Sequence, residues 1–275
     1  MRTITILFLA LFTFHVSFAQ QKANKKKAPF AIGEVDTIYS KILKQKRVIN
    51  IHLPLSYNPD SAATYPVIYL LDGSVGEDFV HIAGLVDYMN MIDILKPTIV
   101  VGIANVDRQH DFTFPTQDPE HQMFKIPTAG GSAKFISFLE KELEPYVAAN
   151  YKTNGSKTLI GQSLGGLLAT EILLKRPALF TTYMIVSPSL WWDNESLLRE
   201  APALLKYNSY NGIKVYLSVG TEGKRMEDDA AQLSTLLKQN NIDQIFLPMP
   251  EENHLTILHR SIYKGFELLY KKPSN

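Results

Sequence analysis

The sequence has 275 residues, of which 45% are hydrophobic and 20% are charged, a composition typical of one large globular domain and not of a disordered chain. Its 28 lysine and arginine residues against 27 aspartate and glutamate residues give a net charge of +1, which excludes the basic surface that a nucleic-acid partner requires. The chain contains no cysteine, which excludes a disulfide framework and lipid attachment through an N-terminal cysteine.

The first residues have the pattern of a secretory signal peptide. A positive Met1-Arg2 start precedes an apolar run over residues 4–14, and the small residues Ser17 and Ala19 are typical of a cleavage site. The apolar run is too short for a membrane span. We therefore expect a leader over residues 1–19 and an exported protein, periplasmic or secreted, without stable membrane insertion after cleavage. An uncleaved anchor is the alternative.

The segment after the leader is short and polar. Residues 20–30 carry four lysines and predict a flexible N-terminus. We expect a single catalytic domain over residues 31–275, because the sequence has no internal repeat after this point. The domain begins with two strand patterns, at residues 35–43 and 47–53. They predict an antiparallel hairpin at the edge of a sheet.

After residue 60 the sequence alternates between short apolar runs and amphipathic segments, which is typical of buried parallel strands connected by helices. The pattern predicts an α/β protein with a mostly parallel central sheet and helices on both faces. We expect strands at residues 67–71, 99–103, 158–160, 183–186, 213–219 and 245–247, and helices at residues 131–148, 164–175, 228–239 and 256–270.

A candidate nucleophile lies between one of these strands and the helix that follows it. The segment Gly161-Gln162-Ser163-Leu164-Gly165 joins the strand that ends at residue 160 to the helix at residues 164–175. A serine at such a turn needs small neighbours, because the strained turn brings backbone segments close together while it projects the hydroxyl above the sheet. Gly161, Gly165 and Gly166 meet that need. We predict Ser163 as a nucleophile; a glycine-rich helix start is the alternative.

A serine hydroxyl is a weak nucleophile and needs a neighbouring base. His254 follows the last predicted strand, in a loop at the carboxyl end of the sheet, where the chain order serine, acid, histidine expects the base. We therefore predict His254 as the general base. The other histidines are expected elsewhere: His15 in the leader, His52 in a strand, His81 and His259 in helices, and His110 and His121 in a long loop.

The third catalytic residue should orient the imidazole and stabilise its cationic form. Glu222 lies in the loop after the strand at residues 213–219 and is the first choice. Asp228 and Asp229 are rivals, because they follow in the next helix and could equally be helix N-terminal charges.

Ester cleavage also needs hydrogen-bond donors for the oxyanion, and one donor is worth about 3 kcal/mol. We expect one from the amide of Leu164, directly after the nucleophile. The other should come from the loop after the strand at residues 67–71, from the amide of Gly73 or of Ser74. The sequence leaves both choices open.

Several segments resemble a known family. They are residues 70–73, residues 101–105 with Arg108 and Asp111, residues 161–166, residues 187–192, and residues 219–222 followed by Met226. Together they are similar to the putative esterase family of α/β-hydrolases, which includes siderophore esterases of the enterobactin and bacillibactin type and feruloyl esterases. The resemblance covers most of the chain after the leader. It implies the α/β-hydrolase fold and supports Ser163, His254 and Glu222 as the catalytic triad.

Three further side chains are candidates for substrate binding. Arg108, in the loop after the strand at residues 99–103, could bind a carboxylate, phosphate or catecholate oxygen, or it could pair with Asp107 or Asp111 to hold the loop. Trp191 and Trp192 follow the strand at residues 183–186. They could form an aromatic wall for an aryl or sugar group, or pack in the core.

Other chemistries have little support. No histidine pair has the His-Glu-x-x-His spacing of a metal site, and the glycines around Ser163 spell neither phosphate-binding pattern. We expect neither a metal nor a cofactor. The chain is therefore interpreted as an exported serine carboxylic ester hydrolase for a small-molecule or carbohydrate-linked ester, such as a siderophore, feruloyl or acetyl ester. An acyltransferase or a non-catalytic binding module on the same fold stays open as an alternative, and the sequence indicates no oligomeric state.

Overall fold

The computed structural model describes residues 28–116, 118–119 and 127–271. The predicted leader, residues 20–27 and His121 lie outside the described residues. Residues 28–31 belong to a separate N-terminal unit and form no helix or strand, whereas one compact unit begins at Ile32. Within the part that is described, no helix is both long enough and apolar enough to cross a membrane.

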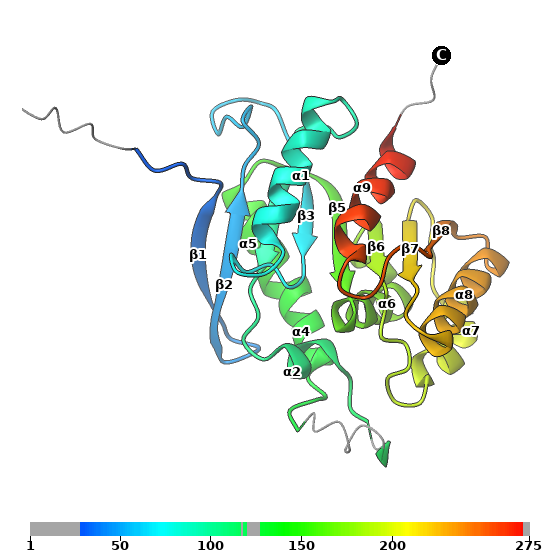
Figure 1. The fold of residues 1–275 in the computed structure, drawn as a ribbon. Coiled ribbons are helices and arrows are strands. Elements are labelled where there is room, and N and C mark those ends of the chain that lie inside the picture. The colour runs from blue at the N-terminus through cyan, green and yellow to red at the C-terminus, as the bar shows by residue number, and fades with distance from the viewer. Residues whose placement is uncertain (1–27, 117, 120–126, 272–275) are drawn as a thin grey trace, which may run out of the picture. The chain divides into compact units, whose positions relative to one another are not determined.

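Eight strands form one mixed sheet in the order β1-β2-β4-β3-β5-β6-β7-β8 (Figure 1). The strands are β1 (Glu34–Ser40), β2 (Gln45–His52), β3 (Tyr65–Leu70), β4 (Ile99–Ile103), β5 (Thr153–Gln162), β6 (Thr182–Val186), β7 (Lys214–Gly220) and β8 (Asp243–Met249). Strand β2 pairs antiparallel with both β1 and β4, and every other pairing is parallel. The predicted N-terminal hairpin and mostly parallel sheet are confirmed.

Helices cover both faces of this sheet, as predicted. Buried side chains of α1 (Phe79–Met91) and α9 (Ile257–Tyr270) pack on one face, and both helices lie in front of the sheet in Figure 1. The opposite face is covered by α4 (Ser132–Phe138), α6 (Leu164–Lys175), α7 (Ser196–Tyr207) and α8 (Lys224–Gln239).

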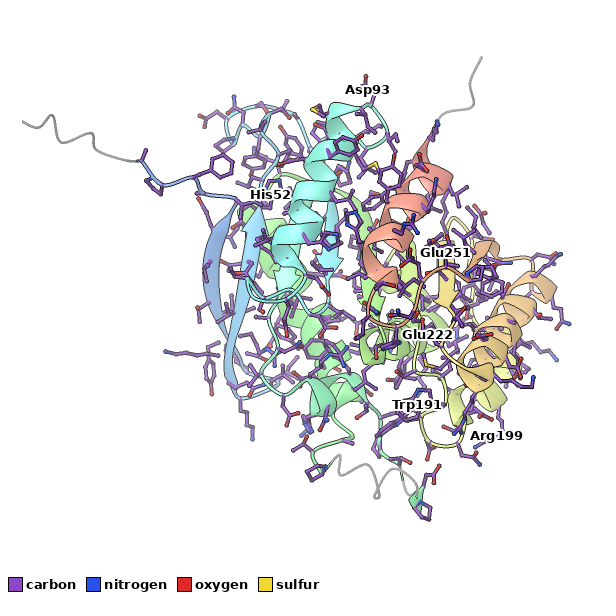
Figure 2. The ribbon with its side chains drawn as sticks, viewed as in Figure 1. His52, Asp93, Trp191, Arg199, Glu222 and Glu251 are labelled. Carbon is purple, nitrogen blue, oxygen red and sulfur yellow. The ribbon has the colours of Figure 1, made fainter. Side chains whose placement is uncertain are left out.

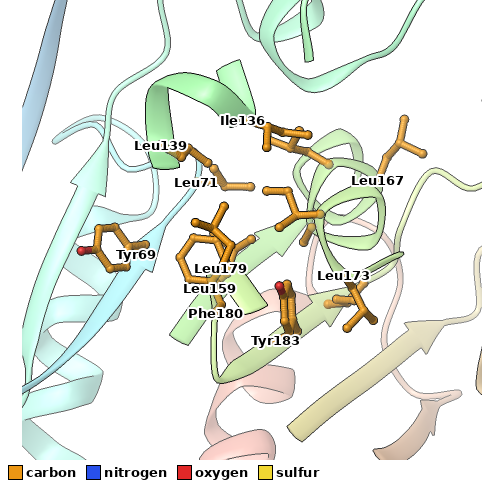
Figure 3. Close-up of a cluster of buried hydrophobic side chains, with 14 of the residues drawn as sticks. Tyr69, Leu71, Ile136, Leu139, Leu159, Leu167, Leu173, Leu179, Phe180 and Tyr183 are labelled. Carbon is orange, nitrogen blue, oxygen red and sulfur yellow. The ribbon is translucent and has the colours of Figure 1, made fainter. Parts of the chain in front are cut away.

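Burial on both faces explains why the central strands are continuously apolar. In β3, Val67 and Tyr69 belong to the cluster on the α6 face, while Ile68 and Leu70 belong to the cluster on the α1 face. Tyr69 is seen in this first cluster in Figure 3. A shift of one residue would turn every side chain to the wrong face, so burial fixes the register. Because β3 to β8 are parallel, the loops after their carboxyl ends meet at the same edge of the sheet.

The structure differs from the predicted elements in several places. The predicted helix at residues 131–148 is interrupted between α4 and α5 (Glu144–Asn150) by a π-helical segment at Leu139–Leu143. Pro145, in the first turn of α5, has no N–H to continue the α-helical bonding pattern. Helix α8 begins at Lys224 and not at residue 228. Helices α7 and α2 (Arg108–Phe112) were not predicted, and α1 was expected only as the helix that contains His81.

Candidate active site

Ser163 lies in a strained turn between β5 and α6. Its backbone has φ 59° and ψ −120°, a conformation that L-residues rarely adopt. A Cβ atom at Gly161 would lie 2.4 Å from the carbonyl oxygen of Gly165, and one at Gly166 would lie 2.9 Å from the Cα of Pro188. The turn therefore requires the small neighbours that the sequence provides, and α6 begins directly at Leu164.

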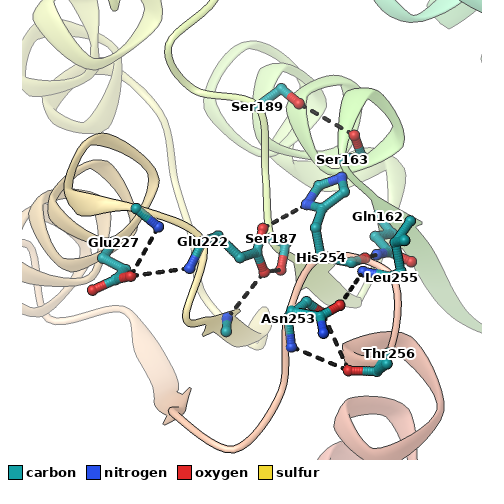
Figure 4. A network of polar contacts seen from close by, with 12 residues as sticks. Gln162, Ser163, Ser187, Ser189, Glu222, Glu227, Asn253, His254, Leu255 and Thr256 are labelled. Atoms are coloured by element: carbon teal, nitrogen blue, oxygen red, sulfur yellow. Dashed lines mark hydrogen bonds and ion pairs between the residues drawn. The ribbon is translucent and has the colours of Figure 1, made fainter.

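The loop after β8 brings His254 to this turn. His254 and Ser163 line the same cleft, and the imidazole lies between Glu222 and Ser163 in Figure 4. Nδ1 of His254 lies 2.5 Å from Oε2 of Glu222. A carboxylate can only accept a hydrogen bond, so Nδ1 carries the proton and Nε2 is left as the basic nitrogen. The side-chain amide of Gln162 donates to the His254 carbonyl over 2.6 Å and holds the loop in place.

Glu222 is a buried carboxylate with several donors. Its side chain is 2% exposed, and its other oxygen, Oε1, accepts hydrogen bonds from the Ser187 hydroxyl and from the Gly220 amide, the latter over 3.1 Å. Burial alone would raise the pKa of Glu222, but the hydrogen bonds from His254, Ser187 and Gly220 outweigh it, so the pKa lies below its ordinary value. Glu222 is therefore ionised beside the imidazole.

The two rival acids lie elsewhere. Asp228 forms an exposed ion pair with Lys224 over 2.5 Å, and Asp229 is buried in α8. Of the three predicted candidates, the structure brings Glu222 alone to His254.

Two serines after β6 belong to this network and were not singled out from the sequence. Ser187, which has φ 43°, donates to Glu222. The Ser189 hydroxyl lies 3.4 Å from the Ser163 hydroxyl, and the Ser189 amide donates to the Ser163 carbonyl over 3.0 Å. Both serines stand in the segment 187–192 that carries the family resemblance, which was the one available signal for them.

The predicted oxyanion donors are not equivalent. Leu164 is the first residue of α6, where a helix leaves its backbone N–H groups without helical partners. In contrast, the Gly73 amide donates to the Ile103 carbonyl over 3.0 Å, and the Ser74 amide donates to the carboxylate of Glu77 over 3.1 Å. The Gly73 amide is thus bonded to the backbone of the neighbouring strand, whereas the Ser74 amide is bonded to a side chain.

The cleft at Ser163 has a volume of about 410 Å³ and carries several carboxylates. Burial, followed by the charges of Asp72 and Glu77, raises the pKa of Asp78 to about 6. A larger cavity of about 650 Å³ lies at the amino ends of β3 and β5. None of the predicted catalytic residues lines it, so the smaller cleft, where polar groups converge, is the candidate active site. The cleft is lined by Asp72, Glu77, Asp78, Arg108, Gln162, Ser163, His254 and Leu255.

Arg108 lines the cleft but has a different partner from those predicted. Its guanidinium forms a two-point ion pair with Asp72, over 2.6 and 2.9 Å. Asp111 pairs instead with Arg47 over 2.7 Å, and Asp107 accepts from the His110 amide as the N-cap of α2. The alternative in which Arg108 pairs with Asp107 or Asp111 is wrong, because both of those side chains turn toward other groups.

The two tryptophans have separate environments. Trp192 is 0% exposed, and its indole N–H donates to the Phe114 carbonyl over 2.9 Å. Of the two roles predicted for Trp192, the structure favours packing in the core, because its side chain is fully buried. Trp191, which is labelled in Figure 2, is partly exposed. Its ring centre lies 6.3 Å from that of Trp192. It stays a candidate for an aromatic contact.

The described residues contain no group of three or more histidine, aspartate or glutamate side chains placed to hold a metal ion. Two predicted strand and helix histidines lie where expected, His52 on β2 (Figure 2) and His81 on α1.

Comparisons with known proteins agree with this fold. The family model described as "Putative esterase" matches residues 40–249. The ferri-bacillibactin esterase BesA of Bacillus subtilis is 29% identical over 239 residues, which are 78% of this chain and 82% of that protein. An IroE-like serine hydrolase from Shewanella oneidensis superposes with a TM-score of 0.78 at 27% identity, over 87% of this chain and 80% of that chain. The BES protein from Bacillus cereus gives 0.77 at 30% identity, over 90% and 98%.

Proposed function

The chain belongs to the putative esterase family and is a carboxylic ester hydrolase, and we propose that it works through an acyl-serine intermediate on Ser163. His254 is the general base and Glu222 is the acid that orients it. The observation that carries this proposal is the 2.5 Å hydrogen bond between His254 and the buried Glu222, with the imidazole between Glu222 and Ser163 (Figure 4).

The proposed reaction has two steps of the same kind. Nε2 of His254 takes the hydroxyl proton as Oγ of Ser163 attacks the ester carbonyl, and the carboxylate of Glu222 stabilises the imidazolium that forms. Collapse of the tetrahedral intermediate breaks the bond to the alcohol, which leaves with the proton from His254. Water then attacks the acyl-serine with His254 again as base, and the carboxylic acid is released.

Two amides are proposed to bind the oxyanion of both tetrahedral intermediates. The Leu164 amide stands at the start of α6, where the helix dipole also favours negative charge. The Ser74 amide becomes the second donor when an oxyanion replaces the Glu77 carboxylate that now accepts from it. Gly73 is left out, because its amide donates to Ile103.

The proposed substrate is a small-molecule ester, with a siderophore ester first among the candidates. The support is the similarity to BesA, which is named a ferri-bacillibactin esterase. Feruloyl and acetyl esters of plant polysaccharide are the next candidates. The predicted leader at residues 1–19 is the basis for proposing that the protein is exported, periplasmic or secreted.

The experiment that tests this function compares the parent chain with Ser163→Ala on p-nitrophenyl acetate, methyl ferulate and a triscatecholate trilactone. We expect turnover by the parent and a loss of at least about 10³-fold in kcat for the variant. Ser137→Ala, which removes an exposed hydroxyl on α4, should behave like the parent. Equal product release by the parent and Ser163→Ala would contradict the serine mechanism, and the preferred ester would identify the substrate class.

A further inference from the structure

Two helices beside the cleft carry a pair of histidines in contact. Helices α1 and α9 lie side by side on one face of the sheet (Figure 1), and buried side chains of both, including Ile82 and Leu258, pack in one cluster. His81 is the third residue of α1, and His259 is the third residue of α9. The two imidazoles meet although 178 positions separate them in the sequence.

The contact between the two rings is close. Nε2 of His81 lies 2.5 Å from Nδ1 of His259, and the ring centres lie 4.7 Å apart with an angle of 37° between the ring planes. Each ring nitrogen of a neutral imidazole is either an N–H donor or a lone-pair acceptor, so one facing nitrogen carries a proton and the other accepts the hydrogen bond. Two imidazole nitrogens therefore converge on one point between the helices.

A metal ion can take the place of the proton between these nitrogens. Imidazole is the commonest metal ligand in proteins, and it suits Zn²⁺, Ni²⁺ and Cu²⁺ better than Mg²⁺ and Ca²⁺, which prefer oxygen. When the proton moves to the outer nitrogen of its ring, both facing nitrogens present lone pairs, which repel each other unless a cation lies between them. Bonds of about 2.0–2.1 Å to the metal place two such nitrogens about 3.0–3.4 Å apart, so the pair needs to open by less than about 1 Å.

The surroundings of the pair allow this movement. The His259 side chain is exposed and that of His81 is half-buried, so rotation of the two side chains opens the pair without a movement of the helices. Arg260, directly after His259, pairs with Glu252 over 2.5 Å, which balances the positive charge that lies next in the sequence. The described residues contain no group of three such ligands, so water completes the coordination, as it does at open zinc sites.

We propose that His81 and His259 form a two-ligand site for a divalent late transition-metal ion, Zn²⁺, Ni²⁺ or Cu²⁺, which joins α1 to α9 beside the cleft. Asp78 of the cleft lies three positions before His81, and Leu255 of the cleft lies four positions before His259. A bound ion therefore connects the segments that carry two sides of the cleft. The sequence predicts no such site, because its ligands come from two separate helices.

Equilibrium dialysis of the untagged chain against Ni²⁺ at pH 7.5 tests the site. We expect one ion per chain and no competition from a 100-fold excess of Mg²⁺, which prefers oxygen ligands. His81→Gln and His259→Gln should each weaken binding by at least about 10-fold, because the loss of an outer-shell partner alone costs metal sites about 10- to 100-fold. The double variant should be little weaker than either single variant, because one substitution already removes the chelate.

His110→Gln is the matched control. His110 is an exposed histidine whose Nδ1 donates to the Thr128 carbonyl over 2.5 Å, and its replacement should leave the affinity for Ni²⁺ within about 2-fold. His254→Ala removes the imidazole of the candidate active site and should still bind one ion. Binding that is lost in His254→Ala and kept in both His81→Gln and His259→Gln would overturn the proposal, because the ion would then lie at the active site.

Two further measurements locate the ion. Ni²⁺ at about 100 times its Kd should raise the unfolding temperature of the parent and of His110→Gln by about 5 °C, and that of His81→Gln or His259→Gln by much less. Bound Ni²⁺ should also slow the carbethoxylation of His81 and His259 by diethylpyrocarbonate by at least about 5-fold, measured on peptides by mass spectrometry, because the reagent attacks the lone pairs that the ion occupies.

Binding by the parent no tighter than binding by the double variant would overturn the proposal, since the ion would then be held by groups other than this pair. Unchanged carbethoxylation of His81 and His259 in the presence of Ni²⁺ would overturn it too. None of these measurements depends on ester hydrolysis, so the metal site and the proposed function fail or stand separately. Ser163→Ala should bind Ni²⁺ as the parent does.

Discussion

Two walls border the cleft at Ser163, and they are built in different ways. The histidine wall consists of His254, which lines the cleft, and of Glu222 behind it, a buried carboxylate that accepts from an imidazole, a hydroxyl and an amide. The acidic wall consists of Asp72, Glu77, Asp78 and Arg108, and its guanidinium pairs with Asp72. The first wall lowers the pKa of its carboxylate, and the second raises that of Asp78.

The difference shows how different environments change the properties of similar carboxyl groups. Donors surround Glu222, so it stays ionised and can stabilise an imidazolium. On the acidic wall, Asp78 has like charges as neighbours, while the negative charge of Asp72 is paired with the positive charge of Arg108. In the proposed mechanism the histidine wall transfers protons, and we expect the acidic wall to set the charge that a substrate meets.

The largest effect is expected on the histidine wall. Glu222→Gln keeps the size of the side chain but removes the charge that stabilises the imidazolium, so kcat should fall by about 10³-fold on any ester. Because the pKa of Glu222 is lowered, the loss should be present throughout about pH 5 to 8. Steady-state kinetics measure it, and Asp228→Asn is the control that should leave kcat within about 2-fold. An equal loss in both variants would contradict the assignment of Glu222.

A smaller effect is expected at Trp192, which is buried in the core. Trp192→Phe opens a gap in the core and leaves the Phe114 carbonyl without its indole donor, so the free energy of unfolding should fall by about 2 kcal/mol. Denaturant titration measures this change, and KM for methyl ferulate should not move. Unaltered stability with a raised KM would instead return Trp192 to the substrate site. Trp191→Phe, at the partly exposed neighbour, should cost less stability.

The smallest effect is expected at Asp78. Its folded pKa of about 6 lies above the ordinary value of 3.8, so the folded state holds its proton longer, and stability falls as pH rises from about 4 to about 6. Asp78→Asn should remove this loss and raise the unfolding temperature at pH 7.5 by about 2 °C, with no gain at pH 4. Above pH 6 the same substitution should also lower the preference for acetylcholine over its uncharged analogue 3,3-dimethylbutyl acetate by about 3-fold.

Asp229→Asn is the matched control for this prediction. The pKa of Asp229 is also raised to about 6 by burial and by Glu195, but Asp229 does not line the cleft. It should show the gain in stability without the change in ester preference. An unchanged preference in Asp78→Asn would mean that the acidic wall does not set the charge selectivity of the cleft.

The two walls also differ in how far the sequence predicts them. Chain order predicts His254 in the loop after the last strand and an acid in the loop after the strand before it, with Glu222 as the first of three candidates. The pairing of Arg108 with Asp72 joins residues 36 positions apart through the packing of two loops, which no local pattern encodes. Likewise, the core position of Trp192 depends on its tertiary neighbours, while its sequence position indicates only the correct edge of the sheet.

Trapping the acyl-enzyme would test the acyl-serine mechanism. The chain would be mixed with p-nitrophenyl acetate, quenched in acid within the first turnovers, and measured as an intact protein and as peptides by mass spectrometry. The acyl-serine mechanism predicts one acetyl group per chain, on the peptide that contains Ser163, and none in Ser163→Ala. Product release with no adduct, or with an adduct on another residue, would contradict it.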